Sequence, residues 1–144
     1  MKRTIIAAIA FLSLVLPLKA EDQALQQYQN LLTPLVKGGT DTLGTPLVYP
    51  DGAVNITSAI VTLQPGAETG WHEHEVPLFG YILEGEMTVD YGTKGTKTYK
   101  AGDSFLEAIN WPHNGVNSGA VPVRLIAVYM GAEGAANTVT TPAP

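Results

Sequence analysis

Short apolar segments separated by turn residues fill the chain from Thr45 onward, and this pattern is the strongest constraint on its fold. Pro and Gly punctuate the segments at close intervals, and no strong helical repeat of apolar residues returns. In EMTVDY, for example, Met87, Val89 and Tyr91 alternate with polar neighbours, as in a half-buried strand. About eight or nine short strands at this spacing favour an antiparallel sandwich or barrel, so the sequence predicts an all-β domain.

The expected strands follow one another through the whole domain, which is predicted to span residues 45–131. They are PLVYP, AVNITSAIVTLQ, WHEHE, FGYIL, EMTVDY, TKTYK, SFLEA, a segment around His113, and VPVRLIAVYM. The last segment is apolar at both alternating faces, which predicts a strand between two packed layers or under a partner subunit. Residues 132–144 have little apolar surface to bury, so we expect a flexible C-terminal tail.

The first twenty residues, 1–20, have the outline of a secretory signal peptide. Lys2 and Arg3 precede an apolar run, and Ala20 offers a cleavage point. The run is shorter than the roughly 20 apolar residues of a spanning helix, which favours cleavage over retention as a membrane anchor. We therefore expect a secreted protein, in the bacterial periplasm, that has no membrane contact after cleavage.

Residues 21–44, between the leader and the first strand, are predicted to form one short helix and an arm. Leu25, Tyr28 and Leu32 lie at helical spacing. They follow Asp22, a residue type that favours the N-terminal cap of a helix.

Charge and cysteine content limit the partners and the source of stability. The chain has a net charge of -5 at pH 7, and removal of the leader deletes basic residues and no acid. Nucleic acid requires a positive protein surface, so we predict no nucleic-acid partner. Since the chain has no cysteine, stability must come from packed apolar surface and not from disulfides.

Two of the three histidines, His72 and His74, stand two residues apart in the predicted strand WHEHE. Side chains in a strand alternate between faces, so both imidazoles point the same way, while Glu73 and Glu75 point the other way. Two imidazoles side by side can bind one metal ion. His113 follows several strands later, and a barrel can return it to the same place.

The spacing around these histidines resembles both motifs of the cupin superfamily. The matching positions are Gly66, His72, His74 and Gly85 in the first motif, and Gly102, His113 and Asn117 in the second. The resemblance covers about residues 45–131. It implies a small antiparallel, jelly-roll-like cupin β-barrel in which the three histidines bind one divalent transition metal ion.

This chain departs from the family pattern at positions that bear on its chemistry. Leu78 occupies the position of the first motif's glutamate, so the usual fourth ligand is missing, and Ala108 and Asn110 replace a proline and a glycine in the second motif. A divalent ion held by three neutral imidazoles keeps its full charge, so the site should favour a small anionic or chelating organic ligand. Fe(II) is the metal expected for oxygen chemistry, with Zn, Mn, Ni and Cu as alternatives.

Glu107 shares a strand face with the apolar Phe105, so we expect its carboxylate inside the barrel, acting as a base or orienting a water. In the alternative orientation, Leu106 points inward and Glu107 outward. A buried carboxylate requires a partner, which a metal, a bound water or a histidine would supply. Phe79 and Trp111, which lie close to ligand positions, are expected to line an apolar pocket.

Three-histidine cupins without the first motif's glutamate are known among oxygenases that cleave small diketones, thiols or hydroxylated aromatics. The resemblance therefore implies a dioxygenase-like reaction on a small chelating organic acid, diketone or phenol. Two alternatives remain open: a non-catalytic module that binds a small anionic ligand or a metal, and a metal-free isomerase or structural cupin. Cupins commonly pair through sheet edges, which together with the apolar final segment implies a homodimer.

Overall fold

The computed structural model describes residues 19–144, so nearly all of the predicted signal peptide 1–20 lies outside the described residues. The chain divides into two compact units, and the boundary between them falls between Thr33 and Pro34. None of the helices within the described range has the length and apolar character that crossing a bilayer requires.

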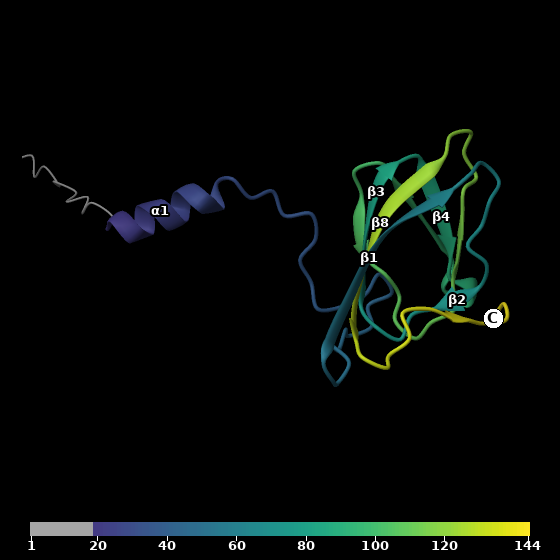
Figure 1. The fold of residues 1–144 in the computed structure, drawn as a ribbon. Helices are drawn as coiled ribbons and strands as arrows, with labels where there is room; N and C mark the ends of the chain where they lie inside the picture. Colours follow the sequence, from purple (N-terminus) through teal and green to yellow (C-terminus); the bar gives the residue numbers. More distant parts are fainter. Residues whose placement is uncertain (1–18) are drawn as a thin grey trace, which may run out of the picture. The chain divides into compact units, whose positions relative to one another are not determined.

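The N-terminal unit contains helix α1 (Ala20–Gln29), in agreement with the predicted short helix (Figure 1). Its N-cap is Lys19, and the predicted cap Asp22 lies instead in the first turn, where a negative charge interacts favourably with the helix dipole. No residue of α1 is buried, and even its apolar Leu25 and Tyr28 are exposed. Among residues 19–33 of this unit, nothing therefore covers the apolar side of the helix.

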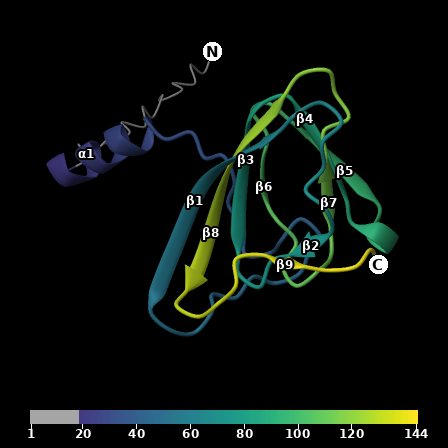
Figure 2. The same cartoon turned by 45° about the vertical axis from the view of Figure 1, so that its right-hand side comes forward.

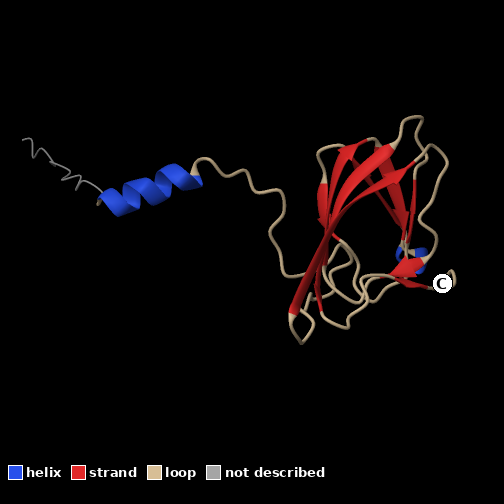
Figure 3. Ribbon diagram, viewed as in Figure 1, coloured by secondary structure: helices blue, strands red, loops and turns tan. Residues whose placement is uncertain are grey.

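The second unit, residues 34–144, is built from strands, which confirms the predicted all-β class (Figure 3). The strands are β1 (Val54–Leu63), β2 (His72–Glu73), β3 (Leu78–Glu84), β4 (Glu86–Asp90), β5 (Thr96–Lys100), β6 (Ser104–Leu106), β7 (Asn114–Val116), β8 (Val123–Ala132) and β9 (Val139–Thr140). One turn of 3-10 helix, η1 (Gly92–Lys94), lies between β4 and β5.

Two antiparallel sheets form the walls of the barrel, as Figure 2 shows. One sheet has the strand order β1-β8-β3-β6 and the other has the order β5-β4-β7. The short strands β2 and β9 pair with each other and lie at one end of the barrel. Strand β8, the segment predicted to be apolar on both faces, lies inside its sheet between β1 and β3.

The core lies between the two sheets. The alternation predicted for β4 is confirmed, because Met87, Val89 and Tyr91 are all buried. They meet buried residues of the facing sheet, which include Leu78, Ile82, Phe105, Val123, Leu125 and Ala127. Complete burial of one such large apolar side chain contributes roughly 1.5–3 kcal/mol, so the core can stabilise this cysteine-free domain without a disulfide.

Gly85 carries the chain from β3 in one sheet to β4 in the other. Its φ of 77° lies in the left-handed region, which glycine adopts without steric strain. A Cβ at this position would lie 2.6 Å from the carbonyl oxygen of Pro122, so the backbone passes too closely for any side chain. The crossing between the sheets therefore requires glycine here.

Two expectations about the ends of the barrel were wrong. The segment 46–50 is not a strand: Pro46 makes one isolated bridge to Thr40, and Val48 and Tyr49 are exposed. The tail 132–144, expected to be flexible, forms β9 and pairs with β2. Backbone hydrogen bonds, and not the burial of apolar side chains, hold this tail against the barrel. The composition of the tail therefore gave no sign that it is ordered.

Candidate metal centre

Backbone pairing brings the three histidines to one end of the barrel. His72 opens β2 and His113 precedes β7, and each residue's amide donates to the other's carbonyl oxygen, at 3.0 and 2.8 Å. His74 lies in an isolated bridge to Ile109. The chain therefore returns His113 to the HxH pair, as the sequence predicted.

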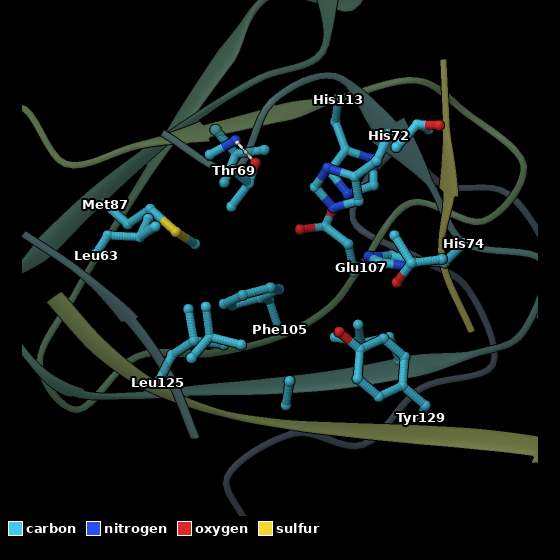
Figure 4. Close-up of a pocket in the computed structure, with 17 residues that line it drawn as sticks. Leu63, Thr69, His72, His74, Met87, Phe105, Glu107, His113, Leu125 and Tyr129 are labelled. Atoms are coloured by element: carbon cyan, nitrogen blue, oxygen red, sulfur yellow. Dashed lines mark hydrogen bonds between the residues drawn. The ribbon is translucent and has the colours of Figure 1, made fainter. Parts of the chain in front are cut away.

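The three imidazole rings face one another around a common point (Figure 4). The ring centroids of His72 and His74 are 4.9 Å apart, those of His72 and His113 are 4.4 Å apart, and those of His74 and His113 are 5.0 Å apart. One potential ligand atom from each ring lies within 4.8 Å of the other two. Neutral imidazole nitrogens at such separations can share one divalent transition metal ion.

The hydrogen bonds of the rings are those of a site that can receive a metal. Each Nδ1 lies 2.8 Å from a backbone carbonyl oxygen: His72 from Gly70, His74 from Asn137 and His113 from Trp111. A carbonyl only accepts, so each Nδ1 carries the proton and each Nε2 keeps its lone pair. This tautomer leaves three nitrogen donors free for a metal, and the donor set therefore fits the ion that the resemblance implies.

Burial keeps the three rings neutral. Desolvation lowers the pKa of His72 and of His113 below the ordinary value, and it lowers the pKa of His74 to about 3. The hydrogen bonds from each Nδ1 to its carbonyl oppose this shift without cancelling it. Because protonation of the imidazoles is disfavoured, protons compete weakly with a metal for these nitrogens.

Glu107 is 4% exposed and lines the same cavity as the three histidines. This is the inward orientation expected because Glu107 and Phe105 share one face of their segment. Its Oε1 accepts a hydrogen bond from the Tyr91 hydroxyl at 2.7 Å and one from the Ala108 amide at 2.7 Å. Within residues 19–144 no hydrogen bond reaches its Oε2. That oxygen is therefore the one available to a ligand in the cavity.

Burial raises the pKa of Glu107, while the hydrogen bonds from Ala108 and Tyr91 act in the opposite direction. The Tyr91 hydroxyl lies 3.3 Å from that of Tyr99, which in turn lies 2.7 Å from the hydroxyl of Thr42. Burial also raises the pKa of both tyrosines, so they stay protonated and Tyr91 donates to the carboxylate. Sequence reasoning placed Tyr91 in the core and missed this support of Glu107.

The cavity has a volume of about 350 Å³. Figure 4 shows the histidines and Glu107 at one end, while Leu63, Met87 and Leu125 lie at the other. Other lining residues are Val61, Thr69, Leu78, Val89, Phe105, Gly115, Ala127, Tyr129, Thr138 and Thr140. Within the described residues, no Lys or Arg belongs to this lining. Leu78 thus presents an apolar side chain where the family pattern has a carboxylate ligand.

The two aromatic residues expected to line the pocket do not line it. Phe79 follows Leu78 in β3, and because side chains alternate along a strand, Leu78 faces the cavity and Phe79 does not. Trp111 packs against the core and donates its indole N–H to the carbonyl oxygen of Tyr91 at 3.0 Å. Closeness in sequence to a ligand histidine did not predict which aromatic side chains face the cavity.

Comparison with known proteins agrees with this geometry. A family profile described as the cupin domain matches residues 59–129. An uncharacterized Klebsiella pneumoniae protein with a double-stranded β-helix domain is similar in structure, with a TM-score of 0.53 and 19% identity over 67% of this chain and 90% of that chain. A search of curated proteins found no match.

Two oxalate decarboxylases also resemble the chain. A mutant of the Bacillus subtilis enzyme has a TM-score of 0.50 and 28% identity, and it covers 59% of this chain and 23% of that one. The Lactobacillus farciminis enzyme in complex with formate has a TM-score of 0.51 and 24% identity, over 59% and 26% of the two chains. The present chain thus matches about a quarter of these enzymes' length. With its motifs, barrel and histidine cluster, the chain belongs to the cupin superfamily.

Proposed function

We propose that this protein is an exported, metal-dependent dioxygenase-like enzyme that acts on a small chelating organic acid, diketone or phenol. The observation that carries the proposal is the convergence of His72, His74 and His113 beside the buried carboxylate of Glu107. A divalent ion bound there, Fe(II) for oxygen chemistry, would hold the substrate through two oxygens and lower the pKa of its enol or hydroxyl group. Dioxygen is the oxidant, and both of its atoms enter the product.

Glu107 is proposed as the base that takes the proton of the substrate's enol or hydroxyl group. Oε1 is already bonded to Tyr91 and Ala108, so the carboxylate is held in one orientation and Oε2 meets the substrate. A general base is most effective when its pKa lies near the working pH, and the raised pKa of Glu107 moves in that direction.

The shape of the cavity supports a substrate with a polar chelating end and an apolar body. A ligand bound at the histidines would extend between Leu63, Met87 and Leu125. Each methylene group buried there is worth about 0.8 kcal/mol, or roughly fourfold in affinity. Small diketones and phenols have such bodies.

Oxalate, the substrate in the names of the two matched decarboxylases, fits this cavity less well. When oxalate chelates an ion through one oxygen of each carboxylate, its two other oxygens would face the apolar wall, where no Lys or Arg of the described lining could pair with them. Burial of a charge without a partner is costly, so oxalate should bind more weakly than a diketone of similar size.

Oxygen consumption by the Fe(II)-loaded protein tests the proposal, with pentane-2,4-dione, catechol and oxalate as probes. The protein should consume oxygen with the dione or catechol, while Glu107→Gln should retain Fe(II) but lose at least about 100-fold in rate. Glu86→Gln is the matched control, because Glu86 is exposed on β4 and should keep wild-type activity.

The second candidate is a module that binds a small anionic ligand or the metal at this site without turnover. In that case neither the wild type nor Glu107→Gln forms product, and both bind the probes with similar affinity. Full activity of Glu107→Gln would instead refute the proposed role of the carboxylate.

A further inference from the structure

The residues 137–141, which we call the C-terminal strap, pass directly beside the histidine cluster. Within the strap, β9 pairs with β2 in a register that places Thr140 opposite His72. The Thr141 amide donates to the Trp71 carbonyl oxygen at 3.1 Å, and the Asn137 side-chain amide donates to the Thr57 hydroxyl at 3.0 Å. Both ends of the strap are therefore tied to the barrel, one to β1 and the other to the start of β2.

The C-terminal strap provides the hydrogen-bond acceptor for the ring of His74, whereas His72 and His113 find theirs in the neighbouring backbone. His72 and His113 each donate Nδ1–H to a carbonyl two residues earlier in the chain, which local backbone provides. His74 donates to the carbonyl of Asn137, 63 residues away in sequence. The Thr138 hydroxyl also lies near this Nδ1, at 3.4 Å. Among the three rings, only the orientation of His74 thus depends on a distant segment.

We propose that the C-terminal strap is a positioning element of the metal centre and that the Asn137 carbonyl fixes His74 for metal binding. By accepting the Nδ1 proton, this carbonyl selects the tautomer whose Nε2 lone pair is free, and it sets the orientation of the ring. Thr138 and Thr140 line the cavity, so the same segment also closes the wall beside His74. The inference rests on the proposed metal site, and metal affinity should depend on the strap.

Truncation gives the first test, with Co²⁺ as the probe and its visible absorption as the readout. A chain ending at Ala136 lacks the Asn137 carbonyl and β9, and it should bind Co²⁺ about 10–100-fold more weakly than the full chain. A chain ending at Thr141 keeps the whole strap and should match the full chain within about twofold. Equal Co²⁺ affinity of both truncated chains would overturn the proposal.

Hydrogen exchange in the full chain gives a second test that does not depend on the folding of a truncated variant. If the strap strengthens metal binding, the metal must strengthen docking of the strap by the same factor. Saturation with Zn²⁺ should therefore slow exchange of the Thr141 amide about 10–100-fold. The Asp103 amide, which bonds to the Lys100 carbonyl in the turn between β5 and β6, should not change. Unchanged exchange at Thr141 would contradict the proposal.

The stoichiometry of Zn²⁺ binding separates the two levels of the argument. If the full chain binds no Zn²⁺, the metal site itself fails and the proposed function fails with it. If the full chain binds one equivalent but the strap has no influence on affinity or exchange, only the positioning role is lost.

Discussion

At the scale of single residues, the site depends on a few hydrogen bonds that orient buried polar groups. Each imidazole donates Nδ1–H to a backbone carbonyl, and the Glu107 carboxylate accepts from the Tyr91 hydroxyl. The sequence predicted the histidine cluster and the inward direction of Glu107, because the period of a strand decides which side chains share a face. It did not predict Tyr91 as a donor, because alternation marks a residue as buried without naming its partner.

Removal of the Tyr91 hydroxyl should affect Glu107 directly. Tyr91→Phe deletes a donor to a buried carboxylate, which should raise the pKa of Glu107 further and lower the free energy of unfolding by roughly 1–3 kcal/mol. Urea unfolding and a pH titration of the carboxyl signal measure the two effects. Tyr81→Phe is the control, because no hydrogen bond from the Tyr81 hydroxyl occurs within the described residues. Identical carboxyl titrations for both variants would contradict this account.

The lowered pKa values of the histidines make the metal-free protein sensitive to acid. The unfolded chain takes up protons on its imidazoles below pH 6.5, whereas folded His74, with a pKa of about 3, does not. Stability should therefore fall from about pH 6.5 downward, by about 1 kcal/mol per pH unit for each such histidine. The raised pKa of Glu107 opposes this loss, because the folded carboxyl binds its proton more readily than the unfolded one does.

Urea unfolding of the metal-free protein between pH 7.5 and 5 checks this pH dependence. His74→Gln should show a shallower dependence than the wild type, because one of the desolvated imidazoles is absent. A pH dependence of His74→Gln as steep as that of the wild type would show that this imidazole is not desolvated as described.

At the scale of elements, the close approach of β3 and β6 shapes the cavity wall. Gly80 lies opposite Phe105 in this pairing, and a Cβ at Gly80 would come within 3 Å of three atoms of the Phe105 ring. Gly80→Ala should therefore displace Phe105 and destabilise the fold by about 1–3 kcal/mol. Gly39→Ala is the matched control, because a Cβ there meets nothing within 4 Å. Equal stability of the two variants in thermal unfolding would contradict the described packing.

Element boundaries were predictable where apolar alternation decides them and not where backbone hydrogen bonds do. Strands β4 and β8 were visible in the sequence because they bury alternating or continuous apolar residues. Strand β9 was not visible, because its short segment is held by pairing with β2 and buries little. The segment 46–50 shows the opposite error, since its apolar Val48 and Tyr49 stay exposed.

At the scale of the whole molecule, β1 is the feature that bears on assembly. Among the strands that the structure describes it pairs only with β8, so it is an edge strand, and it exposes Val54, Ile56 and Ile60. An exposed apolar edge is a surface that pairs readily with another chain, which supports the predicted homodimer. The assembly itself remains a prediction, as do export and the periplasmic location.

Light scattering after size exclusion tests the homodimer. The protein without its leader should elute with the mass of two chains, and Ile56→Glu should shift it to the mass of one chain by placing a charge in the interface. Val121→Glu, which changes an exposed apolar residue outside the strands, should leave the dimer intact. A monomeric wild type would remove the prediction.

The central claim is that His72, His74 and His113 together bind one divalent metal ion. Anomalous X-ray diffraction from crystals of Zn²⁺-loaded protein, recorded on both sides of the zinc absorption edge, tests this most directly. We predict a single anomalous peak between the three imidazoles, with Nε2 of each ring at about 2.0–2.1 Å from the ion. No peak there, or a peak bound by other residues, would contradict the account.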